Sequence, residues 1–155
     1  MRSRLVTLAL VAVVAGCMLA LPAVAQADSE DIYRQEVHIS NNLKPPMWLG
    51  TVSGDINGSV KFQPQPAYSY VVGSVKHFYE IFTITTISGD VISGYDVGVW
   101  NFSTFKFRAQ GWVTSATGAW AHLVGYKYHE MGVTTEFPPP TGVITGTGSM
   151  FLAAP

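Results

Sequence analysis

The chain has 155 residues, which is enough for one domain and leaves no room for a second. Nine basic residues stand against ten acidic ones, and this balance excludes a general nucleic-acid binder, which needs a basic face to displace phosphate counterions. Seven Tyr, eight Phe and four Trp, spaced by fifteen Gly, favour a closed β structure with little helix.

The N-terminus has the three parts of a secretory signal peptide. A basic start, Met1–Arg4, precedes the apolar run Leu5–Ala20, and Ala25–Ala27 has the small-x-small pattern of a cleavage site. We therefore expect residues 1–27 to be removed and the domain to be secreted or to lie in the periplasm or cell envelope. Two alternatives stay open: a lipoprotein anchored through Cys17, and an uncleaved membrane anchor.

Cleavage changes the chemistry that is available to the domain. Arg2 and Arg4 are lost whereas all ten acidic residues follow the cleavage site, so the mature chain is more acidic. The single cysteine is lost as well, which excludes a disulfide, a zinc–thiolate site and a thiol nucleophile. The mature domain must therefore be stabilised by its core alone.

The first half of the mature chain consists of short strand patterns broken by glycine and proline. Residues 28–36 are expected to form a flexible acidic leader, and residues 37–155 the domain itself. Prolines interrupt the pattern after the first strand because they cannot donate to a sheet ladder. The predicted elements are a strand at Glu36–Ser40, a loop at Asn41–Pro46, strands at Trp48–Val52 and Ile56–Gln63, and an edge strand or lid at Ala67–Val72.

The second half has longer strand patterns. Lys76–Ile87 is the longest, and the turn at Ser88–Asp90 predicts a hairpin to the next strand. Further strands are predicted at Val91–Phe102, Phe105–Thr114, Tyr126–Met131 and Val143–Leu152, with a stiff connector at Phe137–Pro140. The total of about eight strands predicts an all-β fold, a small, closed, antiparallel, calycin-like β-barrel, with room for packed side chains or one small ligand.

A corner interrupts the strands late in the chain. Thr117-Gly118 is a turn signal, and Ala119–Val124 is too short and too apolar for an exposed helix. We expect a single helical turn there, with Trp120 and Leu123 plugging the space that the strands enclose.

This corner carries a resemblance. Ala116-Thr117-Gly118, six further residues and then Gly125 resemble the TG-x6-G run of the allene oxide cyclase and dirigent barrel superfamily, to which bacterial spirotetronate-forming cyclases are also similar. The resemblance implies a barrel over residues 37–152 whose lumen folds a reactive substrate without a cofactor. It also implies a homo-oligomer, but it brings no catalytic set residue by residue.

The alternation of residues along a strand predicts the inward face of Phe105–Thr114 but not the inward face of Lys76–Ile87. Phe105, Phe107, Ala109 and Val113 alternate with polar residues and are predicted to point inward. Both faces of Lys76–Ile87 are partly apolar, so neither can be named as the inside.

Three carboxylates are the candidate catalytic residues: Glu80, Asp96 and Glu130. Each is either a lumen acid with a raised pKa or a solvated or ion-paired surface group. A hairpin centred on Gly89 places Glu80 opposite Gly98 and diagonal to Asp96. If both side chains point inward, they are expected to share a proton.

Aromatic residues are the candidate ligand-binding set, and His122 joins them although a structural hydrogen bond explains a corner histidine equally well. The set is Tyr79, Tyr95, Trp100, Trp112, Trp120, His122, Tyr126 and Tyr128. The histidines show no metal-ligand spacing, so neither a metal nor a cofactor is expected.

Three functions follow from this pattern. The first is an exported barrel that encloses an apolar or aromatic small molecule and acts as a cofactor-free cyclase or isomerase by orienting it and excluding water. The second is a carrier with the same pocket and no chemistry. The third is a barrel whose lumen is filled by Trp and Phe side chains and which acts through its surface or as a structural dimer.

Overall fold

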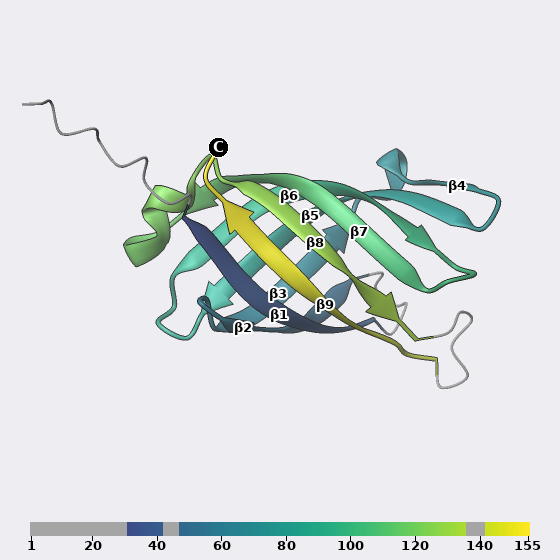
Figure 1. Ribbon diagram of the computed structural model, residues 1–155, viewed down its shortest axis with the longest axis horizontal. Coiled ribbons are helices and arrows are strands. Elements are labelled where there is room, and N and C mark those ends of the chain that lie inside the picture. The colour runs from purple at the N-terminus through teal and green to yellow at the C-terminus, as the bar shows by residue number, and fades with distance from the viewer. Residues whose placement is uncertain (1–30, 42–46, 136–141) are drawn as a thin grey trace, which may run out of the picture.

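The computed structural model describes residues 31–41, 47–135 and 142–155. They form one antiparallel sheet that closes into a barrel (Figure 1). Eight strands follow one another in the order β3-β2-β1-β9-β8-β7-β6-β5, β3 pairs with β5 to close the ring, and β4 extends β5 past the closure. The strands are β1 (Ile32–Asn41), β2 (Trp48–Gly54), β3 (Gly58–Pro64), β4 (Tyr70–Val72), β5 (Val75–Thr86), β6 (Val91–Asn101), β7 (Lys106–Ala116), β8 (Lys127–Thr134) and β9 (Ile144–Ala153). The two 3₁₀ helices are η1 (Pro66–Tyr68) and η2 (Gly118–Leu123).

The predicted closed antiparallel barrel is confirmed. The predicted edge strand or lid at Ala67–Val72 is divided, since Pro66–Tyr68 form η1 and only Tyr70–Val72 form β4. The predicted leader also differs from the structure. Residues 32–36 belong to β1 and are not a flexible leader, since Ile32–Arg34 pair with Phe151–Ala153 of β9. The charged residues of this segment occupy the outward positions, whereas Tyr33 and Gln35 face inward and continue the alternation of the strand. The predicted loop Asn41–Pro46, apart from Asn41, and the predicted connector Phe137–Pro140 lie outside the described residues.

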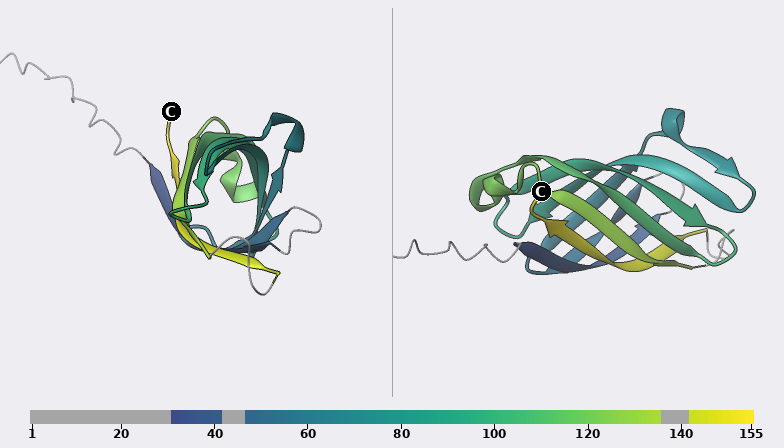
Figure 2. Two further views of the ribbon diagram at one scale, coloured as in Figure 1. Left: turned by 90° about the vertical axis from the view of Figure 1, so that its right-hand side faces the viewer. Right: turned by 45° about the horizontal axis from the view of Figure 1, so that its top comes forward.

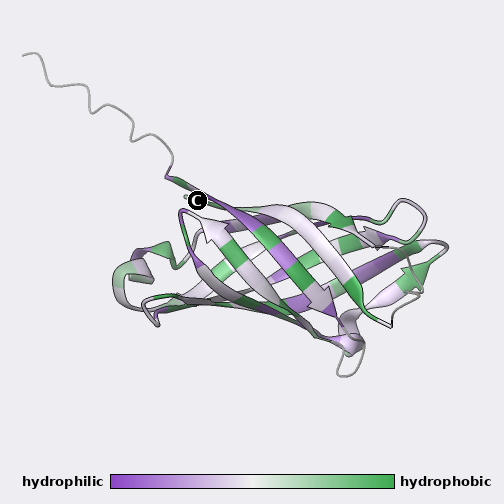
Figure 3. Cartoon of the chain, turned by 90° about the horizontal axis from the view of Figure 1, so that it is seen from below, coloured by the Kyte–Doolittle hydropathy of each residue, from purple (hydrophilic) through white to green (hydrophobic). Residues whose placement is uncertain are grey.

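Alternation along each strand builds the core. On β5 the buried positions are Glu80, Phe82, Ile84 and Thr86, a period of two. Figure 3 shows hydrophobic and hydrophilic bands following one another along the strands. Burial of a large apolar side chain contributes about 1.5–3 kcal/mol each, so the interior supplies the stability that a chain without disulfides requires. The largest fully buried apolar side chains are Val37, Ile56, Phe62, Phe82, Ile84, Ile92, Val113, Leu123, Tyr128, Ile144, Met150 and Leu152.

Glycines on the inner face make space for large rings. A Cβ built on Gly94 would lie 2.6 Å from the Phe82 ring, and one on Gly132 would lie 2.6 Å from the Phe107 ring. Phe78 covers Gly98 in the same way. Eight-stranded barrels fill their interior by matching small and large residues across strands, and here the matching uses glycine and phenylalanine.

The corner closes one end of the barrel, as predicted. Figure 2 looks down the barrel and shows the short helix η2 across its far end. Leu123 is completely buried and Trp120 packs against the core cluster, so both side chains act as the plug. Tyr33 completes the plug with an edge-to-face contact to Trp120, at 5.7 Å between ring centroids.

The Thr-Gly dipeptide ties this corner to the start of β6. The Thr117 hydroxyl accepts a hydrogen bond of 2.8 Å from the Val91 backbone N–H, and the Thr117 N–H donates to the Val91 carbonyl at 2.9 Å. Gly118 has φ +56°, a left-handed conformation that costs other residues about 1–2 kcal/mol. A side chain at this position would also collide with the Asp90 carboxylate.

A pair of alanine substitutions separates these two effects. Gly118→Ala should lower the free energy of unfolding by about 1–2 kcal/mol for the backbone alone, and by more because Asp90 must move. Gly73→Ala is the matched control, since Gly73 has φ +58° and open space around its Cα. Urea denaturation should show the larger loss for Gly118→Ala, and equal losses would contradict a packing role for Asp90.

Candidate carboxyl pocket

A cavity of about 30 Å³ lies inside the barrel at the end opposite η2. It has room for about two water molecules, because one occupies about 10–15 Å³ on the same measure. Trp48 and Trp100 meet edge to face across it, 5.7 Å between centroids, and the Trp100 indole N–H donates to the Thr134 hydroxyl at 2.9 Å. The lining residues are Ile39, Trp48, Phe62, Pro64, Lys76, Phe78, Glu80, Trp100, Phe107, Glu130 and Thr134.

Two carboxyl groups, those of Glu80 and Glu130, line this pocket, and the buried Asp96 lies beside them. Glu80 on β5 pairs directly with Asp96 on β6, and Glu130 projects inward from β8. The residue of β7 paired with Asp96 is Gly111, so no side chain of that strand stands between Asp96 and β8 at this level. The exposed fractions of Glu80, Asp96 and Glu130 are 7%, 0% and 4%, so the structure places all three predicted acids inside one barrel.

The pairing of Glu80 differs from the one predicted. Glu80 stands opposite Asp96 and not opposite Gly98, because the hairpin pairs Thr85 with Val91 and is therefore centred on Ser88. Gly89 then takes a left-handed φ of +91° as the last residue of the turn, a common arrangement in three-residue hairpin loops. The correction brings the two carboxyl groups closer than the diagonal arrangement would.

Hydrogen bonding in the pocket is incomplete. The Tyr128 hydroxyl donates to Glu130 Oε2 at 2.7 Å, and the Tyr128 ring stacks on Phe82 with 4.4 Å between centroids. Glu130 Oε1 and both carboxyl oxygens of Asp96 have no hydrogen-bond partner among the described protein atoms. An ionised carboxylate buried without a partner costs several kcal/mol, so the charged forms are disfavoured here.

The pKa values are accordingly raised. Burial raises the pKa of Glu130 to about 7, although the hydrogen bond from Tyr128 opposes the shift. Burial and the charge of Glu130 raise the pKa of Glu80 to about 8, with Lys76 acting in the opposite direction. Burial, then Glu80 and Glu130, hold the pKa of Asp96 well above its usual range. The cluster therefore exchanges protons near neutral pH, where a general acid or base is most effective.

The predicted aromatic set is divided among three places. Trp100 lines the cavity, and Tyr128 supports Glu130 from below it. Tyr79, Tyr95 and Trp112 occupy outward positions and do not line the carboxyl pocket. Tyr79 and Tyr95 stack on each other outside at 5.8 Å, and this contact explains why aromatic residues recur on the outer face.

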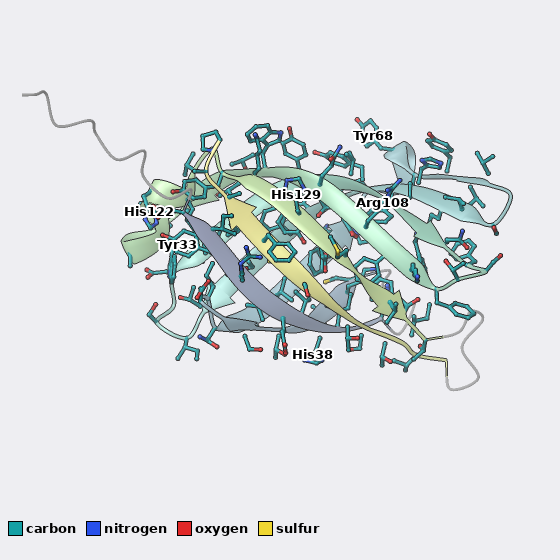
Figure 4. All side chains as sticks on the ribbon, viewed as in Figure 1. Tyr33, His38, Tyr68, Arg108, His122 and His129 are labelled. Carbon is teal, nitrogen blue, oxygen red and sulfur yellow. The ribbon has the colours of Figure 1, made fainter. Side chains whose placement is uncertain are left out.

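The remaining three predicted residues belong to the plug at the other end. Trp120 and Tyr126 pack against the core cluster beside Tyr33. His122 is exposed there, and its ring makes hydrogen bonds of 3.0 Å with the Tyr33 hydroxyl and the Ala119 carbonyl (Figure 4). These contacts agree with the structural explanation of this histidine.

Sequence reasoning missed eight lining residues of the pocket: Ile39, Trp48, Phe62, Pro64, Lys76, Phe78, Phe107 and Thr134. Phe78 and Lys76 precede Glu80 by two and four positions on β5 and therefore share its face. Phe107 was assigned an inward position and no site role. Trp48 joins the pocket through the pairing of β2 with β3, which local pattern does not reveal.

Other polar groups lie apart from the pocket. His38, Arg108 and His129 occupy outward positions (Figure 4). Within residues 31–41, 47–135 and 142–155, no three His, Cys, Asp or Glu side chains form an arrangement suited to a metal ion. The same residues include no helix with the length and hydropathy to cross a membrane.

Comparison with family models, curated proteins and solved structures gives no match to the chain. The chemistry of the site must therefore be argued from the pocket itself.

The raised pKa values predict an inverse dependence of stability on pH. Between about pH 4.5, the ordinary pKa of a Glu side chain, and about pH 7, folded Glu130 keeps a proton that the unfolded chain has released. The free energy of unfolding should therefore fall as pH rises through this window, by up to about 3 kcal/mol from this residue. Glu130→Gln should remove that part of the decrease.

Urea denaturation at about pH 5 and about pH 8 measures the effect. Glu36→Gln is the matched control, because it removes an exposed carboxylate from the outer face of β1. It should leave the decrease unchanged. A wild-type protein that becomes more stable from pH 5 to pH 8 would contradict the burial of protonated carboxyl groups.

Proposed function

We propose that this protein is a small-molecule-binding barrel whose carboxyl pocket transfers protons to and from its ligand. The observation that carries the proposal is that Glu80 and Glu130 line a cavity walled by aromatic rings, with the buried Asp96 beside them. The ligand has an apolar or aromatic body and one polar group that reaches the carboxyl groups. The corresponding reaction class is a cofactor-free isomerisation or cyclisation, in which orientation and proton transfer lower the barrier.

The pocket supports a role in chemistry beyond packing. A barrel filled only to be stable gains from apolar side chains, and replacing buried charged groups by apolar ones of similar size is often neutral or stabilising. Three buried acids, two of them with unpaired oxygens, are therefore costly as packing material. A role in proton exchange near neutral pH explains why the barrel contains buried acids despite their cost in stability.

The size of the pocket decides how a ligand binds. Cavities that hold whole drug-sized molecules measure about 300–1,000 Å³, whereas this one measures about 30 Å³. Only a small head group reaches the carboxyl groups without displacing a side chain. The body of the ligand lies between the rings of Trp48, Phe78, Trp100 and Phe107, which must rotate to admit it.

The sequence motifs extend this proposal. The signal-peptide pattern of residues 1–27 supports export, with a lipid on Cys17 as the alternative. The Thr117-Gly118 corner and the closed barrel support kinship with allene oxide cyclase and dirigent barrels, a fold-level analogy that carries no activity by itself. An exported protein would take its substrate from outside the cytoplasm.

Native mass spectrometry of protein purified from its source, repeated after extraction with a denaturing organic solvent, tests the proposal. We expect a small apolar molecule in the extract. Incubated in D₂O with fresh wild-type protein, that molecule should take up deuterium, and Glu130→Gln should slow the uptake at least tenfold. Glu36→Gln should not.

Two results would overturn parts of the proposal. A bound molecule that exchanges no deuterium would make the barrel a carrier without chemistry. If nothing is extracted, and the neutral dye Nile red also fails to bind, the pocket has no ligand and the barrel acts through its surface or as a structural dimer.

A further inference from the structure

The carboxyl pocket has more acidic groups than its surroundings balance. Lys76 is the one basic residue among the described residues that line it, against Glu80 and Glu130 in the lining and Asp96 beside them. Asp96 is completely buried with both carboxyl oxygens unpaired, and Glu130 adds Oε1. These three oxygens are hydrogen-bond acceptors that lack donors once the carboxyl groups ionise.

Aromatic rings line the cavity next to these acceptors. Trp48, Phe78, Trp100 and Phe107 line the pocket together with the acids. The faces of aromatic rings attract cations, and Trp does so most strongly. The aromatic rings and the carboxyl groups both favour a positive charge on a ligand.

We propose that the head group of the ligand is a protonated amine, which enters the cavity and donates its N–H groups to Asp96 and Glu130 while its apolar body lies among the aromatic rings. This inference rests on the proposed function, since it names the substrate class of the same pocket. A primary ammonium has three N–H donors, which matches the three unpaired acceptor oxygens. Its small size suits a cavity of about 30 Å³.

The other charge states of a ligand fit less well. A carboxylate or phosphate would meet three acidic groups and a single lysine. A neutral apolar molecule would leave the acceptor oxygens of Asp96 and Glu130 without donors, and each buried group left unpaired costs about 1–3 kcal/mol. Only the ammonium supplies donors and positive charge together.

Amine binding must be linked to proton release. The titratable groups that face the site are Lys76 and Glu80 on β5, Asp96 on β6, and Tyr128 and Glu130 on β8. The inward residues of β7 and β9 at this level, Ala109, Gly111, Met150 and Leu152, carry no charge. An ammonium replaces protons held by the carboxyl groups, so its affinity should rise with pH as long as the amine itself stays protonated.

Three probes with one ring and different charge test the inference: benzylamine, benzyl alcohol and benzoate. Isothermal titration calorimetry at about pH 6 and about pH 8 measures their affinities for the full-length mature protein. We expect benzylamine to bind at least tenfold tighter than benzyl alcohol at the higher pH, benzoate to bind most weakly, and the amine preference to shrink at the lower pH. The heat of benzylamine binding should change with the ionisation enthalpy of the buffer, because protons are released.

Substitutions of Asp96 and Glu130 test whether these acids cause the preference for benzylamine. Asp96→Asn and Glu130→Gln keep the side-chain shapes, and each should lower the ratio of benzylamine affinity to benzyl alcohol affinity at least tenfold. Glu36→Gln should change neither probe, and benzyl alcohol binding itself shows that each variant is folded.

The outcomes separate the two proposals. Benzyl alcohol that binds as tightly as benzylamine to the wild-type protein would overturn the amine inference and leave the small-molecule pocket in place. A benzylamine preference that survives both substitutions would overturn the role of the acids. Failure of all three probes to bind would overturn the inference together with the pocket on which it rests.

Discussion

Pairing between β3 and β5 closes the sheet into a barrel with an interior. Gly58 pairs with Thr86 at one end of this contact and Pro64 with Glu80 at the other, so closure ends where the carboxyl pocket begins. Beyond Glu80, β5 exchanges its partner and pairs with β4. Without closure the inward face of β5 would meet water, and Glu80 would be an ordinary surface carboxylate. The unusual chemistry of the interior therefore depends on the backbone pairing of β3 with β5.

The three buried acids have a large effect on the stability of the domain. A domain of this kind is stable by about 5–15 kcal/mol, and each buried ion costs several kcal/mol unless it is paired. Three buried carboxylates, all ionised, would consume most of that stability. The carboxyl groups must therefore keep their protons, share protons with one another, or bind a cation. Binding a cation is the option that connects the fold to a ligand. The apolar remainder of the barrel, from Phe82 to the plug at Leu123, provides the stability that tolerates them.

Local pattern in the sequence predicted the strands well because a period of two survives in almost every segment. The hairpin at Ser88–Asp90, the inward row of Phe107, Ala109 and Val113, and the plug of Trp120 and Leu123 all follow from residue order and turn chemistry. Phe105 is an exception. Its φ of +59° places it in the turn before β7, where its carbonyl accepts the Thr134 N–H at 2.8 Å.

The candidate site was harder to predict because aromatic residues lie on both faces of the sheet. Tyr79 is stabilised outside the barrel by Tyr68 and Tyr95, so being aromatic does not indicate the lumen. The three acids share inward positions, but parity alone allowed either face for each of them. Trp48 reaches the pocket through the pairing of β2 with β3 together with the closure of β3 on β5, and the closure has no local signal in the chain.

Direct observation of the carboxyl protonation states tests the central claim, that Glu80, Asp96 and Glu130 form one buried proton-holding cluster. NMR titration of protein labelled with ¹³C at the Asp and Glu carboxyl carbons follows every acidic group separately. The structure predicts that Glu130 titrates near pH 7, that Glu80 titrates near pH 8, and that Asp96 keeps its proton well above the usual range. Ionisation of all three below about pH 5, the usual range of Asp and Glu, would contradict the buried cluster and the function built on it.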